Sequence, residues 1–259
     1  MDLVEARARN FEAGSRHPWE RARLALIGRL VARHLTLQPG DAVLDVGCGD
    51  TFVVEGLAQA YPAVRFYAVD SAFTDELIET YRARLKVPNV SLFASLDAVR
   101  LDRPASLVLL MDVIEHVPDD VAFLADLCAR PCIGDRTRLL ITVPSYQRLF
   151  CSHDRFLGHY RRYSSRTLGR LLDAVRLVPI EAGHLFASLL PVRVLQVLRE
   201  RVAGSRDAPS DLATWRGGES KARALAAMLT LDGRLALFLV RVGVRIPGLS
   251  NFAICRKSA

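Results

Sequence analysis

The chain has 259 residues, of which 51% are hydrophobic and 24% charged, and its formal net charge is +7. This apolar content is ample for a folded core, which excludes an intrinsically disordered chain. The positive charge favours acidic partners, such as an anionic small molecule or a membrane surface. Because the arginines are spread along the chain and no array of aromatic side chains accompanies them, we expect no nucleic-acid partner.

The N-terminal residues and the cysteines indicate the cellular compartment. Residues 1–5 include charged side chains and lack the apolar segment of a secretory signal. The five cysteines are an odd number and are scattered, which suits a reducing compartment better than a disulfide framework. Cys128 and Cys132 have no second ligand pair nearby, so we expect them to bind no metal. These features predict a cytoplasmic protein.

Residues 1–39 are predicted to form an N-terminal helical cap that ends at Pro39-Gly40. From Trp19 onward, apolar residues recur at intervals of three and four, which is typical of a helix with one buried face. The residues on that face are Leu24, Ile27, Val31 and Leu35.

The next segment runs from Val43 to Asp50 and joins a strand to a glycine turn. Mostly apolar residues around Asp45 indicate a buried strand, which leads directly into Gly47-Cys48-Gly49. Glycine allows a tight turn and lets a ligand approach the main chain. In a βαβ unit, this position is the crevice beyond the carboxyl end of a strand, where nucleotide-like ligands bind.

The residues around this turn favour one kind of nucleotide. A dinucleotide site needs a third small residue where this chain has Phe52, and the carboxylate of Asp45 would repel a pyrophosphate. The same carboxylate would attract a cationic ammonium or sulfonium group. Asp70 follows the second predicted strand, at the spacing where an acid binds ribose hydroxyls. The pattern predicts an adenosyl ligand without phosphate; a strand–turn–helix unit without a ligand is the alternative.

At these residues the sequence resembles the class I S-adenosylmethionine-dependent methyltransferases. Their first motif is an acid followed by Gly-x-Gly, and their second is an acid at the end of strand two. The resemblance implies that Asp45, Gly47 and Gly49 line the methionine portion of S-adenosylmethionine and that Asp70 holds its ribose. The segment 17–23 is also similar to an element that caps the cofactor cleft in one bacterial branch that acts on small molecules and lipids; a plain packing helix is the alternative.

Alternating strands and helices predict an α/β fold with a doubly wound sheet. The predicted strands are 43–46, 64–69, 89–93, 106–111, 137–143, 177–184 and 251–255. The resemblance implies a Rossmann-like methyltransferase fold with a mostly parallel, seven-stranded sheet, in which the last strand lies antiparallel between strands five and six. The expected organisation is a cofactor-binding core at 40–185, a helical insertion or lid at 186–250, and the last strand at 251–259.

Two further segments follow strand ends. Residues after strand three meet the adenine in the resembled family, which points to Ser95 and its neighbours. Strand four ends at Asp112, which begins an Asp-x-x-Glu-His element similar to that of small-molecule methyltransferases. The resemblance assigns Ser95 and Asp112 to cofactor binding. His116 is a separate candidate at the edge of the cleft, or a histidine that bonds locally.

The loop between strands five and six is dense in polar side chains. Because methyl transfer to an alcohol, phenol or amine requires the loss of a proton, His153 and His159 are the candidate catalytic bases, with Asp154 as an orienting partner. Candidate substrate contacts are Tyr146, Arg161, Arg162 and Tyr163, of which the arginines could pair with a phosphate or carboxylate. The alternative is structural, with the arginines on a solvated turn. A metal site formed by His153, Asp154 and His159 would usually need a third well-placed ligand, so we expect no metal.

Residues 186–250 exceed what the core fold requires. Two helices are expected at 189–202 and 221–246, joined by a linker at 203–218 that is rich in Gly, Ser, Asp and Pro. The apolar run 235–242 is too short and too interrupted by arginine to span a bilayer. The segment could cover the substrate, pair with a second subunit, contact the inner membrane peripherally, or pack on the sheet as a helical hairpin.

The sequence therefore predicts methyl transfer from S-adenosylmethionine to a small-molecule or lipid-linked acceptor, at oxygen in preference to nitrogen or carbon. The alternatives are an N- or C-methyltransferase of a natural product or isoprenoid, a non-catalytic cofactor-binding scaffold or membrane-associated partner protein, and a nucleotide-sugar or NAD enzyme. The sequence carries no signal for the oligomeric state.

Overall fold

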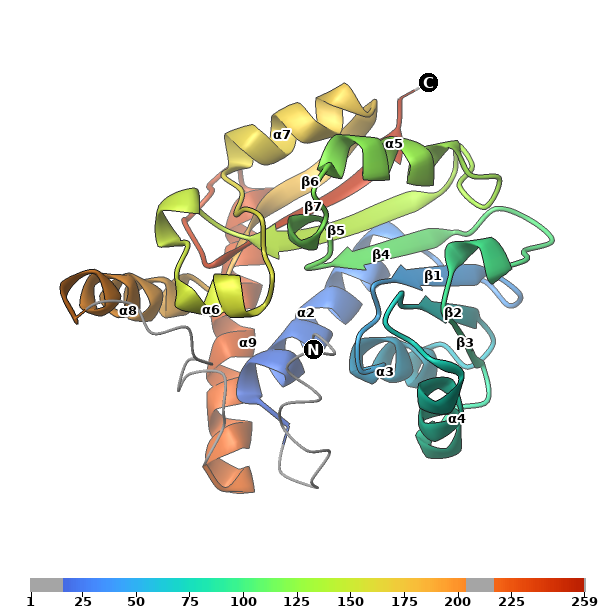
Figure 1. Cartoon of the computed structure of the whole chain (residues 1–259), viewed down its shortest axis with the longest axis horizontal. Helices are drawn as coiled ribbons and strands as arrows, with labels where there is room; N and C mark the ends of the chain where they lie inside the picture. Colours follow the sequence, from blue (N-terminus) through green and yellow to red (C-terminus); the bar gives the residue numbers. More distant parts are fainter. Residues whose placement is uncertain (1–15, 204–216, 259) are drawn as a thin grey trace.

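A computed structural model describes residues 16–203 and 217–258, which form a seven-stranded sheet with helices on both faces (Figure 1). The strand order is β3-β2-β1-β4-β5-β7-β6, and all neighbours are parallel except β7, which is antiparallel to both β5 and β6. The predicted doubly wound fold, with the last strand between strands five and six, is confirmed. The strands are β1 (Ala42–Val46), β2 (Arg65–Val69), β3 (Val90–Phe93), β4 (Leu107–Met111), β5 (Arg138–Pro144), β6 (Leu177–Leu185) and β7 (Ser250–Lys257).

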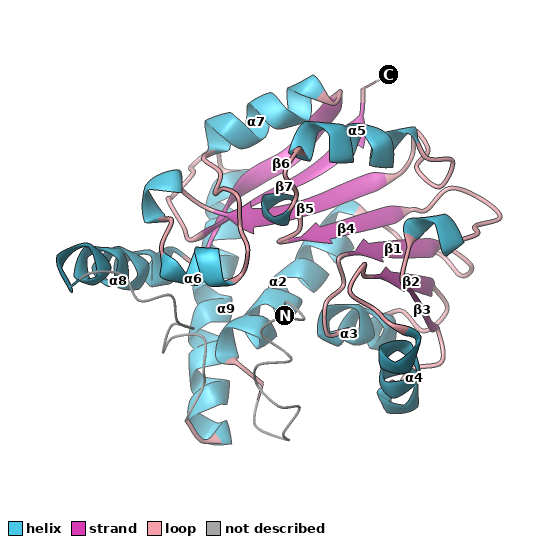
Figure 2. Ribbon diagram, in the orientation of Figure 1, coloured by secondary structure: helices cyan, strands magenta, loops and turns pink. Residues whose placement is uncertain are grey.

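The helices form one layer on each face of the sheet (Figure 2). Successive residues of a strand face opposite sides, so Val43 belongs to one core cluster and Leu44 to the other. The first cluster packs against α2 (Pro18–His34), α3 (Phe52–Ala60), α4 (Asp75–Arg84) and α9 (Glu219–Arg241). The second packs against α5 (Asp120–Ala129) and α7 (Ser165–Ala174).

The predicted N-terminal helix is present as α2. His17 caps it by accepting a hydrogen bond from the amide of Trp19 at 3.2 Å, and Pro18 occupies a first-turn position where a missing N–H costs nothing. Of the four residues predicted to form the buried face of this helix, Ile27 and Val31 are buried, and Leu24 and Leu35 are half-buried. Residues 1–15 of the predicted cap lie outside the described residues.

The insertion before β7 contributes two helices that lie in different places (Figure 1). Helix α9 packs on α2 and β6 through small residues: a Cβ added to Gly233 would lie 2.2 Å from Leu26 Cδ1. Helix α8 (Leu190–Ala203) buries Val197 against the segment after β5 and leaves most of its apolar side chains exposed. The predicted linker lies mostly outside the described residues.

Helix α9 ends earlier than the apolar pattern predicts, at Arg241 instead of residue 246. Gly243 has a φ of +84°, a left-handed conformation that ends many helices and that favours glycine. In the described ranges, no helix has both the length and the hydropathy needed to cross a bilayer.

Short helices occupy the loops at the carboxyl ends of the strands. They are η1 (Leu96–Ala98) after β3, η2 (Ile114–His116) after β4, η3 (Gln147–Leu149) and α6 (Ser152–Phe156) after β5, and η4 (Ala187–Leu189) after β6. The sequence pattern did not predict α6 because five residues are too few to show helical periodicity. These loops contain most of the predicted site residues.

Candidate functional site

The glycine turn after β1 joins the two acidic motifs. Gly47 and Gly49 have φ values of +71° and +58°, and the amide of Gly49 donates a 2.9 Å hydrogen bond to Oδ2 of Asp70. A Cβ added to Gly47 would lie 2.6 Å from Cγ2 of Val113, so both the conformation and the space at this position require glycine. The predicted proximity of Asp70 to this turn is present in the structure.

Asp45 lies at the carboxyl half of β1 with no exposed surface. Neither of its carboxylate oxygens has a hydrogen-bond partner among the described residues. Burial raises the pKa of Asp45 to about 7, although the nearby charge of Arg23 acts in the opposite direction. A buried carboxyl group without a partner is costly, so a cationic hydrogen-bond donor placed beside it would be stabilising. The ammonium group of a methionine moiety has this chemistry.

Asp112 follows β4 and meets the N-terminal helix. Its Oδ2 atom lies 2.9 Å from Nη2 of Arg23, and its Oδ1 atom accepts a hydrogen bond from Thr142 at 3.2 Å. Arg23 is 7% exposed, and its guanidinium lies 5.0 Å from the centroid of the Trp19 ring. Arg23 thus joins α2 to the residue after β4 and, through Thr142, to β5. The role of the segment 17–23 as a cap on the cofactor cleft stays a prediction.

Ser95 is exposed and begins η1, where its hydroxyl accepts a hydrogen bond from the amide of Asp97 at 3.1 Å. Because the amide of Asp70 bonds to the carbonyl of Phe93 at 3.1 Å, the segment after β3 lies beside Asp70. Its predicted contact with adenine stays a prediction.

Asp154 is the centre of the loop after β5. It has no exposed surface, and its carboxylate accepts hydrogen bonds from His159 Nδ1 at 2.9 Å, Arg162 Nε at 2.8 Å and the amide of Cys151 at 2.9 Å. Burial alone would raise the pKa of Asp154, but the hydrogen bond from His159 and the charge of Arg162 hold it well below its usual value. Asp154 was the expected orienting partner of His153 or His159, and in the structure it orients His159.

The two candidate bases differ in environment. His153 lies in α6, and burial, aided by the charge of Arg193, lowers its pKa to about 4. A histidine with this pKa is neutral near pH 7 and is a weak proton acceptor. His159 has Nδ1 fixed by Asp154, which leaves Nε2 as the nitrogen for chemistry. Both roles stay predictions.

The candidate substrate residues fall into two groups. Arg162 is 5% exposed and also donates to the carbonyl of Ser145 at 3.2 Å, and the buried hydroxyl of Tyr163 donates to Asp120 at 2.6 Å. These two side chains hold the loop to the core, and Arg162 does not lie on a solvated turn. Tyr146 and Arg161 are half-buried: Arg161 forms a 3.0 Å ion pair with Asp120, and the ring of Tyr146 stacks on that of His184. All four substrate contacts stay predictions.

A cluster that sequence spacing did not reveal joins η2 to this loop. Glu115 has no exposed surface, and neither of its carboxylate oxygens has a hydrogen-bond partner among the described residues. The rings of His116 and His159 meet edge to face, with centroids 4.5 Å apart. One potential ligand atom from each of Glu115, His116 and His159 lies within 4.8 Å of the others. Only the folded loop brings His159 to the Glu-His pair.

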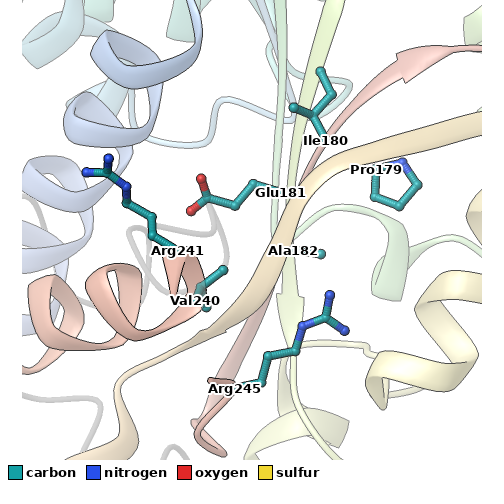
Figure 3. Close-up of a pocket in the computed structure, with 7 residues that line it drawn as sticks. All are labelled: Pro179, Ile180, Glu181, Ala182, Val240, Arg241 and Arg245. Atoms are coloured by element: carbon teal, nitrogen blue, oxygen red, sulfur yellow. The ribbon is translucent and has the colours of Figure 1, made fainter. Parts of the chain in front are cut away.

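A separate surface pocket of about 310 Å³ lies between β6 and the end of α9 (Figure 3). Glu181 lines it, but its carboxylate already bonds to Arg33 at 2.7 Å and to His34 at 2.8 Å. The pocket residues come from β6, from the end of α9 and from the segment after α9, and none belongs to the predicted cofactor site: Pro179, Ile180, Glu181, Ala182, Val240, Arg241 and Arg245.

Comparison with known proteins identifies one family. Residues 19–181 match the family model described as a methyltransferase domain. No curated protein sequence matches the chain significantly.

Several solved structures share the fold. Coclaurine N-methyltransferase bound to N-methylheliamine and S-adenosylhomocysteine is 14% identical, with 98% of this chain and 86% of that chain covered and a TM-score of 0.54. The Haemonchus contortus phosphoethanolamine N-methyltransferase 2, bound to phosphomonomethylethanolamine and S-adenosylhomocysteine, is 16% identical, with 99% and 57% covered and a TM-score of 0.55. The [4+2]-cyclase SpnF is 15% identical, with 91% and 82% covered and a TM-score of 0.53. Because one of the three is a cyclase, the fold alone does not specify the reaction.

Proposed function

Because the chain belongs to the methyltransferase-domain family and is a class I S-adenosylmethionine-dependent methyltransferase, we propose that it methylates an oxygen atom of a small-molecule or lipid-linked acceptor. S-adenosylmethionine is the cofactor, and it supplies an electrophilic methyl group on a sulfonium. The observation that carries the assignment of the cofactor site is the unpartnered, fully buried carboxyl group of Asp45 beside the glycine turn.

The residues at the ends of β1 and β2 fit this cofactor. Asp45 would accept hydrogen bonds from the ammonium of the methionine portion, and the turn at Gly47 and Gly49 has the left-handed backbone that glycine permits. Asp70, held by the amide of Gly49, would bind the ribose hydroxyls. Asp112 and Ser95 complete the predicted cofactor set on either side.

The acceptor must be aligned with the methyl group and must lose a proton. In-line displacement depends mainly on alignment, which the loops after β4 and β5 would provide. His159, oriented by Asp154, is the stronger candidate base, and His153 is the weaker one because of its low pKa. Arg161 and Tyr146 would contact the acceptor.

Turnover with cell fractions tests this assignment. The purified chain is incubated with S-adenosylmethionine and aqueous or lipid extracts, and S-adenosylhomocysteine and new methyl ethers or esters are measured. His153→Ala and His159→Ala should lower turnover and leave S-adenosylhomocysteine affinity unchanged. Binding of the cofactor without turnover on any fraction would favour the scaffold function instead, and protection from heat by NAD but not by S-adenosylhomocysteine would favour an NAD enzyme.

A lipid-linked acceptor is supported by an apolar stripe on α9. Met228, Leu231, Leu235, Phe238 and Val242 recur at intervals of three and four and are each 52–66% exposed. Such a stripe on an amphipathic helix can lie in the interfacial region of a bilayer.

Three exposed arginines lie along one side of this stripe. They are Arg223, Arg234 and Arg241, and they could contact anionic headgroups. We therefore propose peripheral contact of α9 with an anionic membrane.

Flotation with anionic and with neutral vesicles tests the membrane contact. The chain should bind the anionic vesicles, and Leu231→Ser with Phe238→Ser should reduce binding at least tenfold. Val178→Ser, which removes an exposed apolar residue from the edge strand β6, is the matched control and should leave binding unchanged. If the paired substitution converts a dimer to a monomer and vesicle binding is absent, the stripe is a subunit interface, because the same spacing also suits two packed helices.

A further inference from the structure

Glu115, His116 and His159 form a compact group of potential ligands at the carboxyl end of β4. One ligand atom of each lies within 4.8 Å of the others, and no second group of three such residues occurs in the described ranges 16–203 and 217–258. The backbone holds the group together, since the amide of Tyr160 donates to the carbonyl of Glu115 at 2.8 Å. The two chain segments are therefore fixed against each other before any ligand binds.

Glu115 is the independent sign of a missing partner. Its side chain is fully buried, both carboxylate oxygens lack a hydrogen-bond partner among the described residues, and the carboxylate of Asp112 lies nearby. A buried, unpaired carboxyl group is costly, whereas one that binds a cation is stabilised.

His159 is oriented as metal-binding histidines usually are. Its Nδ1 atom donates to the buried carboxylate of Asp154 at 2.9 Å, and this carboxylate is itself held by Arg162 and the amide of Cys151. A carboxylate bonded to one ring nitrogen fixes the tautomer and leaves the other nitrogen, Nε2, to bind a metal. The ring of His116 meets that of His159 edge to face, with centroids 4.5 Å apart.

We propose that Glu115, His116 and His159 bind one divalent transition-metal ion, with zinc as the best match to two imidazoles and one carboxylate. In zinc sites the ligand atoms lie about 2.0–2.2 Å from the metal, so each of three atoms within 4.8 Å of one another needs to move by less than about 1 Å. Three protein ligands leave at least one coordination position open, which is typical of a catalytic site and not of a structural one.

The open position gives the ion a function that rests on the proposed oxygen methylation. A hydroxyl bound to the metal has a lowered pKa and releases its proton to water more readily. The same nitrogen of His159 cannot both bind a metal and accept this proton. This site therefore changes the expected role of His159 from base to ligand and differs from the predicted absence of a metal.

Metal binding to the full chain tests the site directly. Protein treated with EDTA and dialysed free of metal is titrated with Co²⁺, followed by its visible absorption, and then with Zn²⁺ in competition. We expect one Zn²⁺ to bind per chain. The Co²⁺ form should show the visible absorption bands of cobalt bound by nitrogen and oxygen ligands and no thiolate-to-cobalt charge-transfer band. Glu115→Gln and His159→Gln should each weaken Zn²⁺ binding at least tenfold.

His153→Gln is the matched control, because His153 is also beside Asp154 but lies outside the cluster, and it should leave Zn²⁺ binding unchanged. If Glu115→Gln fails to fold, the stoichiometry and spectrum of the unmodified chain and of His159→Gln decide the question. No stoichiometric binding, or a thiolate spectrum, overturns the site. Calorimetry with S-adenosylhomocysteine on the same sample separates the two proposals. Cofactor binding without metal binding overturns the metal site and leaves the methyltransferase assignment intact. Metal binding without cofactor binding supports the metal site and contradicts the methyltransferase assignment.

Discussion

The ionisation of Asp45 should make cofactor binding depend on pH. Burial raises the pKa of this carboxyl to about 7 in the ligand-free protein, so it is mostly protonated below pH 7 and mostly charged above. An ammonium group prefers the charged form. Affinity for S-adenosylhomocysteine, which keeps the ammonium, should therefore approach its full value as the pH rises above 7 and should fall as the pH decreases.

The size of the effect follows from the fraction of charged carboxyl. For a pKa of 7, the affinity is reduced by a factor of about 11 at pH 6.0 and about 1.3 at pH 7.5, so binding should weaken about eightfold between these values. Isothermal titration calorimetry at several pH values measures this change. Asp45→Asn should bind about 10–100 times more weakly at pH 7.5, because a charge-assisted hydrogen bond is lost, and should show no change with pH.

Two results would refute this reasoning. If Asp45→Asn keeps the same pH dependence as the unmodified chain, another group titrates and Asp45 does not face the ammonium. If the affinity of the unmodified chain is constant from pH 6.0 to 7.5, the carboxyl is not protonated in the ligand-free protein in this range.

Three further substitutions probe separate parts of the structure. Asp70→Ala should weaken S-adenosylhomocysteine binding at least tenfold in calorimetry, while the melting temperature changes by only a few degrees, because the residue is only half-buried. Gly233→Ala should lower the free energy of unfolding by about 1–3 kcal/mol in urea titrations, since its Cβ would lie 2.2 Å from Leu26 Cδ1. Asp154→Asn should lower it by about 3–5 kcal/mol, because Arg162 would become a buried, unpaired charge.

Asp70→Ala and Gly233→Ala each have a control in the same chain. Asp102→Ala removes a carboxylate that is 88% exposed and should leave cofactor affinity unchanged. Gly169→Ala places a methyl group in a helix where no atom lies within 4 Å, so it should stabilise the protein by about 0.5–1 kcal/mol. Equal effects of Gly233→Ala and Gly169→Ala would show that α9 does not pack on α2 as described.

The sequence by itself determined the core fold and the cofactor turn, because both depend on neighbours along the chain. The apolar run around Asp45 predicts a buried strand, and glycine is required where the strand turns, as the φ values of Gly47 and Gly49 confirm. Strand seven was placed by resemblance, and its pairing with both β5 and β6 confirms that placement.

The packing of α9 was decided by tertiary contacts. Its apolar residues lie all round the helix near the end, so periodicity did not show which face is buried. The small residues Ala222, Ala226 and Gly233 are buried, with Gly233 against Leu26 of α2, whereas Leu235 and Phe238 are exposed. The face of a helix that carries small side chains is buried when a second helix packs closely against it. Here the second helix, α2, is far away in the sequence, so the buried face cannot be read from local periodicity.

The polar cluster around His159 was likewise decided by the folded structure. The sequence pattern singled out His153, His159 and Asp154, but not which histidine Asp154 orients or that Glu115 lies beside His159. The hydrogen bonds to Asp154 join residues that are up to eight positions apart in the loop after β5. The backbone bond from Tyr160 to Glu115 joins this loop to the one after β4, and its geometry is set by how β4 and β5 place the two loops. Local sequence specifies strands and turns through sterics and periodicity, whereas the burial of a charge and the identity of its partner depend on contacts that exist only after the chain has folded.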